Sequence, residues 1–259
     1  MTARTWLTLP TYNEVANIER IVRAIVEQLE RAVPGDFRVL VIDDSSPDGT
    51  GEVADRLAEE LPEVCVLHRT TKDGLGRAYL AGFQYAVDQG AEIVGVMDAD
   101  FSHDPAYLPA LLEATGRSDI VIGSRYVEGG QIADWPPLRR ILSRGGSLYA
   151  RSILGVHVRD LTGGFKFIRR EVLETMDLSS LRAQGYVFNI ELTYRALLAG
   201  FSVEEIPICF RDREIGDSKM SLPIAFEALK LVPSLRRSAR EARRRPAPVA
   251  VPEDTTERV

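Results

Sequence analysis

The sequence has little cysteine and no long apolar run. No stretch of about 18 apolar residues occurs, so we predict no membrane-spanning helix. The N-terminus lacks a basic stretch followed by an apolar one, so we expect no signal peptide. The two cysteines, Cys65 and Cys209, lie in apolar runs, which favours buried free thiols in a reducing compartment over a disulfide. Together these absences predict a cytoplasmic protein.

The net charge is unevenly distributed along the chain, with an acidic body and a basic strip near the end. The net charge of −6 gives no reason to expect a nucleic-acid partner. Residues 236–245 hold six Arg and one Glu, and residues 246–259 hold three acidic residues and one Arg, so residues 1–235 carry −9. An acidic body with a basic strip indicates attraction to an anionic surface, and a solvated, disordered tail is the alternative reading.

Two common nucleotide-binding motifs are missing. Gly74-Leu75-Gly76 begins like a dinucleotide-binding fingerprint, but Tyr79 stands where the third glycine is needed. The chain also has no glycine-rich loop with a phosphate-binding lysine. These two absences argue against hydride transfer with a nicotinamide cofactor and against P-loop chemistry.

Apolar runs alternate with helical patterns along the first half of the chain. The runs that predict strands cover 6–9, 38–43, 64–68, 92–98 and 119–125. Helical patterns cover 15–32, 48–61 and 75–89, and Pro105 opens a fourth helix. This alternation predicts an α/β fold with a mostly parallel central sheet flanked by helices.

The alternation breaks between residues 126 and 160. Strand patterns return at 165–170 and 203–210, a helix is expected over 187–199, and an apolar helix over 222–235. We expect a single domain over 1–235, including amphipathic segments at 130–155 and 222–235. Residues 236–259 are first basic and then rich in proline and acid, and we expect this tail to be disordered.

Acidic residues follow three of the first four predicted strands. They lie within residues 10–14, 43–50 and 98–100. A single acid after a strand is often only a helix cap. Three acidic clusters at one edge of a sheet repel one another, so they need a cation or hydrogen-bond donors nearby. The pattern therefore predicts a ligand site at this edge, where parallel sheets bind their ligands.

Asp98-Ala99-Asp100 is the most informative of these clusters. Carboxylates two residues apart just beyond a strand reach one hard divalent cation, because Mg²⁺ and Mn²⁺ prefer oxygen ligands. Such an ion would stabilise a diphosphate as it leaves. The same pattern occurs on many solvated loops, and its position after an apolar strand favours the metal site here.

Seven motifs occur in one order along the chain. They are PTYNE (10–14), DDSSPDGT (43–50), DADFSH (98–103), GSRY (123–126), DLTGGFK (160–166), GYVFNIE (185–191) and FRDREIGDSK (210–219). Together they resemble the family-2 glycosyltransferases with a GT-A fold, which is a Rossmann-like fold of nucleotide-diphospho-sugar transferases. Within that family they are similar to the dolichol- or polyprenol-phosphate mannose synthases without C-terminal transmembrane helices.

The resemblance implies roles for individual residues. The nucleotide sugar would contact Pro10, Tyr12, Glu14, Ile42, Asp44, Asp98, Ala99, Asp100, Arg213 and Lys219. The acceptor phosphate would contact Arg125, Arg139 and Ser143. Asp98, Asp100 and Ser102 would hold the metal, although some members have Gln at the position of Ser102. The catalytic candidates are Asp100 and Arg125.

The reaction implied by the resemblance is inverting transfer of mannose from GDP-mannose to a polyprenyl (dolichyl-type) phosphate, with Mg²⁺ or Mn²⁺ as cofactor. A phosphate monoester is largely ionised at pH 7, since its second pKa is about 6, so the acceptor needs no dedicated base. Two alternatives stay open at this stage: the same transfer from a UDP-sugar such as UDP-glucose, and a non-catalytic partner subunit.

Two segments indicate how a chain without transmembrane helices could meet a lipid. Trp135–Leu154 mixes large apolar residues with four arginines, as an interfacial amphipathic helix does. Residues 222–245 place an apolar helix before the arginine strip. We therefore expect a peripheral protein at the cytoplasmic face of the membrane, bound to the membrane surface or to an integral membrane partner protein.

Some residues of these motifs also have plain structural interpretations. Asp160 and Thr162 precede two glycines, so a turn is as reasonable as a substrate contact. Glu191 on its predicted helix is better explained as a buried structural carboxylate than as an acceptor-side group. His103 is expected to pack in a loop, and Arg125 could pair with a surface acid.

Overall fold

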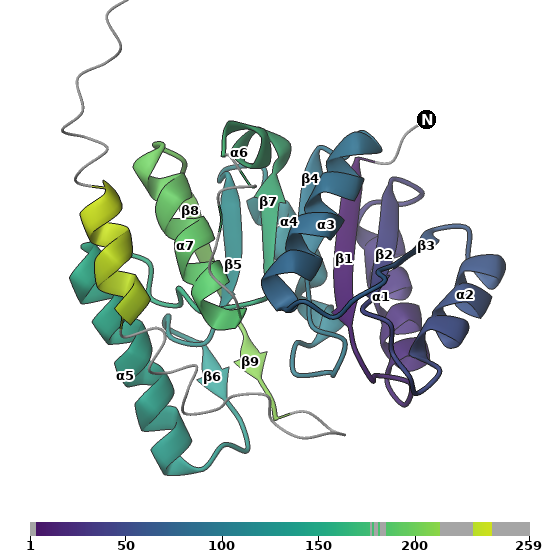
Figure 1. Ribbon diagram of the computed structural model, residues 1–259, viewed down its shortest axis with the longest axis horizontal. Helices are drawn as coiled ribbons and strands as arrows, with labels where there is room; N and C mark the ends of the chain where they lie inside the picture. The colour runs from purple at the N-terminus through teal and green to yellow at the C-terminus, as the bar shows by residue number, and fades with distance from the viewer. Residues whose placement is uncertain (1–3, 177, 179–180, 182–184, 213–229, 240–259) are drawn as a thin grey trace, which may run out of the picture.

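A seven-stranded sheet with helices on both faces forms the centre of the molecule (Figure 1). The computed structural model describes residues 4–176, 178, 181, 185–212 and 230–239. The strands are β1 Thr5–Thr11, β2 Phe37–Asp43, β3 Val64–His68, β4 Ile93–Val96, β5 Ile120–Ser124, β7 Lys166–Arg169 and β8 Val203–Pro207. The helices are α1 Ile18–Ala32, α2 Thr50–Glu60, α3 Leu75–Asp88, α4 Leu108–Ala114, α5 Pro137–Leu154, α6 Arg170–Thr175 and α7 Gly185–Leu198, with a 3₁₀ turn, η1, at Pro105–Tyr107.

The strand order is β3-β2-β1-β4-β7-β5-β8. β7 runs antiparallel to both β4 and β5, and the other neighbouring pairs are parallel. The predicted α/β class and mostly parallel sheet are therefore confirmed. Because β7 is reversed, the loop that precedes it lies at the same edge of the sheet as the loops that follow β4 and β5.

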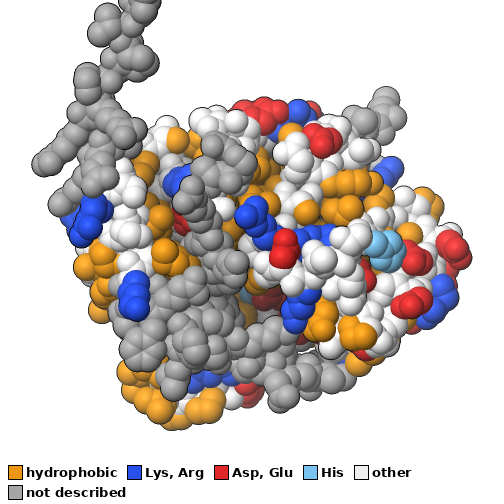
Figure 2. Space-filling view, in the orientation of Figure 1, with side chains coloured by type: hydrophobic (Ala, Val, Ile, Leu, Met, Phe, Trp, Pro, Cys, Tyr) orange, Lys and Arg blue, Asp and Glu red, His pale blue; other side chains and the backbone are white. Residues whose placement is uncertain are grey.

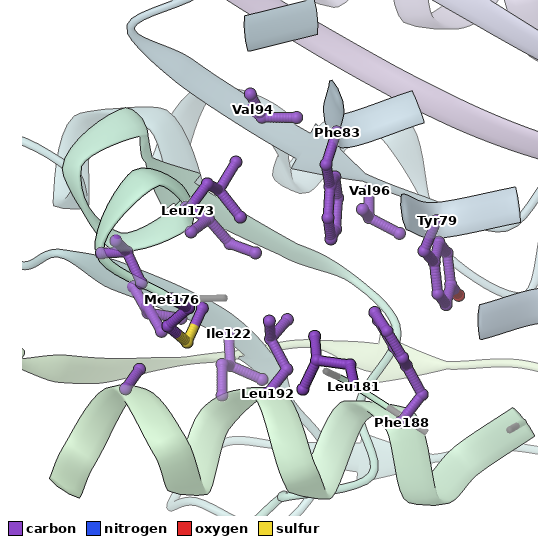
Figure 3. Close-up of a cluster of buried hydrophobic side chains, with 14 of the residues drawn as sticks. Tyr79, Phe83, Val94, Val96, Ile122, Leu173, Met176, Leu181, Phe188 and Leu192 are labelled. Atoms are coloured by element: carbon purple, nitrogen blue, oxygen red, sulfur yellow. The ribbon is translucent and has the colours of Figure 1, made fainter. Parts of the chain in front are cut away.

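The inner strands are buried on both faces, whereas the edge strands β3 and β8 are largely half-buried, so the core has two layers. On one face, Tyr79 and Phe83 of α3 pack with Phe188 and Leu192 of α7 (Figure 3). The other face is covered by α1, α2 and α4, whose apolar residues pack against alternate residues of β1 and β2. Helix α3 approaches the sheet closely at Gly82, where a Cβ would lie 2.4 Å from Cδ1 of Ile42. The N-terminus of α3 is thereby held at the carboxyl edge of the sheet.

The late strands differ from the prediction. The expected strand 203–210 divides into β8 in the large sheet and β9 Cys209–Phe210, which pairs with β6 Gln131–Ile132 in a separate two-stranded sheet. The division falls after Pro207, the last residue of β8, which is paired with Ser124. The N–H of Ile208 still donates to the carbonyl of Ser124, so the chain leaves β5 only where β9 begins. Both cysteines are free, and both are half-buried, not fully buried.

The amphipathic segment 130–155 contains helix α5, while most of the segment 222–235 lies outside the described residues. Residues 230–239 are helical, with Val232 fully buried in the core and Arg236 donating to the carbonyl of Ile153. Among the described residues, no helix combines the length and the apolarity that crossing a membrane requires.

Candidate active site

A pocket opens at the carboxyl ends of β1, β2, β4 and β5. The predicted site residues that line it are Pro10, Tyr12, Glu14, Asp44, Asp98, Ala99, Asp100, Ser102, Arg125 and Arg139. Ile42 does not line it, because its side chain points into the core against α3. Ser143 is turned toward the hydroxyl of Tyr126, at 2.6 Å, and Arg213 and Lys219 lie outside the described residues.

The backbone is strained at three of the loops that form the pocket. Asn13, Ser45 and Phe101 follow β1, β2 and β4, and their φ angles are 59°, 56° and 59°. Left-handed backbone is unfavourable for residues other than glycine, least so for Asn, and such residues cluster at functional sites. The strain therefore marks the same edge of the sheet as the acidic clusters do.

The end of the pocket beside β1, β2 and β3 is built around Asp44. Arg69, the first residue after β3, donates to Asp44 and also pairs with Asp73. Burial raises the pKa of Asp44, and the charge of Arg69 opposes that shift. Tyr12 follows β1 and carries the ammonium of Lys72 over its ring. This end thus offers a carboxylate and an aromatic face, the groups that would hold a nucleoside.

The end of β4 carries the two carboxylates. Asp100 is buried and accepts from the backbone N–H of Ser102 at 3.0 Å, while the side chain of Asp98 is 37% exposed. The hydroxyl oxygen of Ser102 is buried and has no hydrogen-bond partner among the described residues. His103 Nδ1 accepts from the backbone N–H of Asp98 at 3.3 Å, and burial lowers the pKa of this histidine. His103 is thus a buried neutral group that lines the pocket.

These side chains fit a hard divalent cation. Two carboxylates and an unpartnered hydroxyl oxygen face one pocket, and oxygen is the ligand that Mg²⁺ and Mn²⁺ prefer. No group of three or more His, Cys, Asp or Glu side chains in the described part of the chain has an arrangement that would hold a metal. The remaining ligands would therefore come from a substrate diphosphate and water.

The end of β5 places Arg125 in the pocket, held by a buried acid. Asp160 is fully buried, and its carboxylate accepts hydrogen bonds from Nε and Nη2 of Arg125, both at 2.7 Å. The same carboxylate accepts a third hydrogen bond from the backbone N–H of Arg125 at 3.0 Å. Thr162 accepts a further bond from Arg125 at 2.7 Å. The carboxylate of Glu205 accepts from the backbone N–H of Asp160 and from the hydroxyl of Ser124. A guanidinium is thereby fixed in one orientation at the wall of the pocket.

The sequence did not reveal Asp160 as the partner of Arg125. The expected turn before Gly163 and Gly164 is present, and it carries both the buried carboxylate and part of the pocket wall. A Cβ on Gly164 would lie 3.4 Å from the hydroxyl of Tyr79 and 3.8 Å from Oδ1 of Asp98. The motif DLTGGF was the available signal, but its spacing does not reveal a partner 35 residues away.

Arg139 and Glu191 occupy different positions relative to the pocket. Arg139 lines it, stacks over Trp135 at 3.9 Å and pairs with Asp212 at 3.0 Å. Glu191 is buried, pairs with Arg195 one turn along α7 and does not line the pocket. The structural interpretation of Glu191 therefore agrees with its position. Lys72 and Tyr79 also line the pocket, and neither was singled out as a site residue from the sequence.

Comparison with known proteins places the chain in a family. The model of "Glycosyl transferase family 2" matches residues 7–177. Undecaprenyl-phosphate mannosyltransferase of Micrococcus luteus is 47% identical over 221 residues, which are 85% of this chain and 89% of that protein. Polyprenol monophosphomannose synthase of Mycolicibacterium smegmatis is 49% identical over 222 residues, covering 85% and 82%.

Solved structures share the fold at low sequence identity. Mannosyl-3-phosphoglycerate synthase of Rubrobacter xylanophilus matches with a TM-score of 0.67 and 17% identity, covering 97% of this chain and 79% of that one. A mannosyltransferase of Pyrobaculum calidifontis, solved with GDP-Man and Mn²⁺, matches with a TM-score of 0.57 and 19% identity, covering 93% and 75%.

These likenesses show the fold, which is the GT-A type of α/β fold with a mostly parallel central sheet flanked by helices. The chain belongs to the family-2 glycosyltransferases. The fold and the family that the seven motifs predicted are therefore confirmed.

Proposed function

We propose that this protein transfers mannose from GDP-mannose to a polyprenyl (dolichyl-type) phosphate, giving polyprenyl-phosphate mannose and GDP. The observation that carries the proposal is the order of charges along one pocket. Two carboxylates stand at the end of β4, and the buried guanidinium of Arg125 stands beyond them at the end of β5. The names of the relatives from Micrococcus luteus and Mycolicibacterium smegmatis, at 47% and 49% identity, support mannose and a polyprenyl phosphate as substrates.

The donor would lie along the edge formed by β2, β1 and β4. Tyr12 and Asp44 would contact the nucleoside, and Pro10, Glu14 and Ala99 would line its path toward the diphosphate. Asp98, Asp100 and Ser102 would hold a Mg²⁺ or Mn²⁺ ion. When bound, that ion neutralises the diphosphate and stabilises its charge as GDP departs. Arg213 and Lys219 are proposed, from the resemblance alone, to contact the donor as well.

The acceptor phosphate would bind at Arg125, with Arg139 at the rim of the pocket. Its oxygen attacks the anomeric carbon of mannose while the bond from that carbon to the diphosphate oxygen breaks, so one displacement inverts the anomeric centre. The attacking oxygen is already ionised near neutral pH, and no base is required. Arg125 instead offsets the repulsion between two anions, because its guanidinium is held in place before the substrate arrives.

Helix α5 would meet the membrane that carries the acceptor. Leu138, Ile141, Leu142 and Leu148 are 67%, 66%, 60% and 55% exposed on this helix. Figure 2 shows hydrophobic side chains gathered over the same end of the molecule. Arg140 and Arg144 are exposed among them, and Arg139 on the same turn lines the pocket. An apolar stripe with arginines, beside the acceptor end, favours a helix that lies in the interface of an anionic bilayer.

Donor and acceptor use are tested by incubating the purified protein with labelled GDP-mannose or UDP-glucose, a short polyprenyl phosphate and Mg²⁺ or Mn²⁺. We expect labelled lipid from GDP-mannose only, and none in excess chelator. Label from UDP-glucose alone would establish the alternative donor. No label from either donor would favour a non-catalytic partner subunit.

Membrane contact is tested by sedimentation with vesicles that contain phosphatidylglycerol. Ile141→Glu with Leu142→Glu should release the protein from the vesicles, because both side chains are exposed and apolar. Val15→Glu is the control, since Val15 is 42% exposed and stands between β1 and α1, two elements that lie far from α5 in Figure 1. Equal sedimentation of both variants would show that another segment or a partner protein provides the attachment.

A further inference from the structure

The loop between β3 and α3 places a cation on an aromatic face inside the pocket. The ammonium nitrogen of Lys72 lies 3.3 Å from the centroid of the Tyr12 ring, and both residues line the pocket. Atoms in van der Waals contact lie about 3.5–4.0 Å apart, so a nucleobase stacked on this ring face would need the space that the ammonium occupies. Binding of a base there therefore requires the ammonium of Lys72 to move off the ring and to form a hydrogen bond elsewhere.

The strand order shows which part of a nucleotide is nearest to Lys72. Along the edge of the sheet β3 is followed by β2, β1 and β4, so Lys72, Asp44 and Tyr12 come before the carboxylates of Asp98 and Asp100. A diphosphate belongs beside those two carboxylates and their cation. Lys72 is thus at the nucleobase end, where its new partner would be a group on the edge of the base.

The loop is anchored so that Lys72 stays near that end. Arg69 bridges Asp44 and Asp73, and its side chain is only 13% exposed. Gly74 ends the loop with φ of 105°, a conformation that other residues rarely adopt. Lys72 itself is exposed and forms no ion pair within the part of the chain that the structure describes. Its side chain is therefore free to swing while the loop backbone remains fixed at Arg69.

We propose that Lys72 is a base-specificity residue. A base that stacks on Tyr12 displaces the ammonium, which then donates to an oxo group on the edge of that base. An ammonium has three donors and no acceptor. Guanine presents O6 and N7 as acceptors on one edge, whereas adenine and cytosine present an amino donor there. Lys72 therefore favours oxo bases, guanine and uracil alike, over amino bases, and this inference rests on the nucleotide-sugar site of the proposed function.

The test compares two nucleotides that differ at the oxo group. GDP carries O6 and a proton on N1, and 2-aminopurine riboside 5′-diphosphate keeps the 2-amino group and N7 but lacks both O6 and the N1 proton. Binding of each is measured by calorimetry in the presence of Mn²⁺, without acceptor. Lys72→Met should weaken the binding of GDP by roughly three- to tenfold, the range for one charge-assisted hydrogen bond made by an exposed side chain. The affinity for the other nucleotide should stay unchanged.

Arg77→Met is the matched control. Arg77 is an exposed cation on the first turn of α3 that does not line the pocket, so its replacement should change neither affinity. Equal weakening of both nucleotides by Lys72→Met would mean that the lysine contacts the diphosphate, and no weakening would mean that its place on Tyr12 has no role in binding. Either result overturns the inference. Because the measurement needs no sugar transfer, a failure of the proposed reaction would leave the contrast between the two nucleotides intact.

Discussion

Replacement of Asp160 by Asn removes the carboxylate that holds Arg125 at the pocket wall. The side chains of Arg125 and Asp160 are 7% and 0% exposed, so solvent screens their interaction little. Asparagine has one oxygen and an amino group, and that amino group would face the N–H donors of Arg125. Leaving a buried charge without its partner costs about 3–5 kcal/mol. The free energy of unfolding of folded proteins is about 5–15 kcal/mol. A loss of about 3–5 kcal/mol is therefore large, but over most of that range the variant still folds.

The pH dependence of the same pair has a definite sign. Burial by itself raises the pKa of Asp160, but the charge and hydrogen bonds of Arg125 outweigh burial and lower it below its usual value. The stabilisation is therefore present above the unfolded pKa of about 3.9 and is lost as the pH falls through the lower folded pKa. Asp160→Asn should lack this acid-dependent component.

Urea denaturation at pH 7 and steady-state kinetics check both effects. At a temperature where the variant is folded, its KM for polyprenyl phosphate should rise about ten- to a hundredfold. A loss of this size is expected when a charged hydrogen-bonding group loses its orientation. GDP affinity should stay unchanged, since Arg125, the residue that Asp160 holds, lies at the other end of the pocket. Asp55→Asn is the control, because Asp55 is 52% exposed and its hydrogen bond with His68 lies at the surface, where such contacts contribute little. Wild-type stability and wild-type acceptor KM in Asp160→Asn would refute the reasoning.

Three further predictions concern residues around the pocket. Gly164→Leu should keep the fold and weaken GDP-mannose binding in calorimetry, because its Cβ would make ordinary contacts with Tyr79 and Asp98 while the rest of the side chain fills the pocket. Ile42→Ala should destabilise the protein by about 2–5 kcal/mol in thermal unfolding and leave GDP affinity unchanged, since Ile42 is fully buried in the core. Lys166 is fully buried, and burial lowers its pKa to about 7. Wild-type stability should therefore rise between pH 7 and pH 10, by at most about 1.4 kcal/mol per pH unit, and Lys166→Met should flatten that slope in urea titrations.

Local sequence patterns were sufficient for the fold class and for the edge that carries the pocket. The apolar runs of β1, β2, β4 and β5 are buried on both faces, so their periodicity is a direct consequence of the parallel sheet. The acidic clusters follow these strands, and a parallel sheet brings the loops after them to one edge. That is why Tyr12, Asp44 and Asp98 could be placed near one another without coordinates.

Other features depend on contacts that local patterns do not contain. A strand pattern does not reveal direction, so the reversal of β7 and the resulting place of Gly164 were not predictable. Asp160 and Arg125 are 35 residues apart, and only the fold brings them together. Ile42 belongs to a strand buried on both faces, where side chains on either face look alike in sequence. Its side chain lies in the core and does not line the pocket, so its predicted contact with the nucleotide would have to come from its backbone.

The most direct test of the account is the anomeric configuration of the lipid product. The purified protein is incubated with GDP-mannose, a short polyprenyl phosphate and Mn²⁺, and the product is analysed by mass spectrometry and by the coupling of its anomeric carbon in NMR. Attack by the acceptor phosphate held at Arg125 predicts a β-linked mannosyl phosphate from the α-linked donor, and no product from Arg125→Met. An α-linked product, or a mannolipid formed equally well without Arg125, would contradict the account.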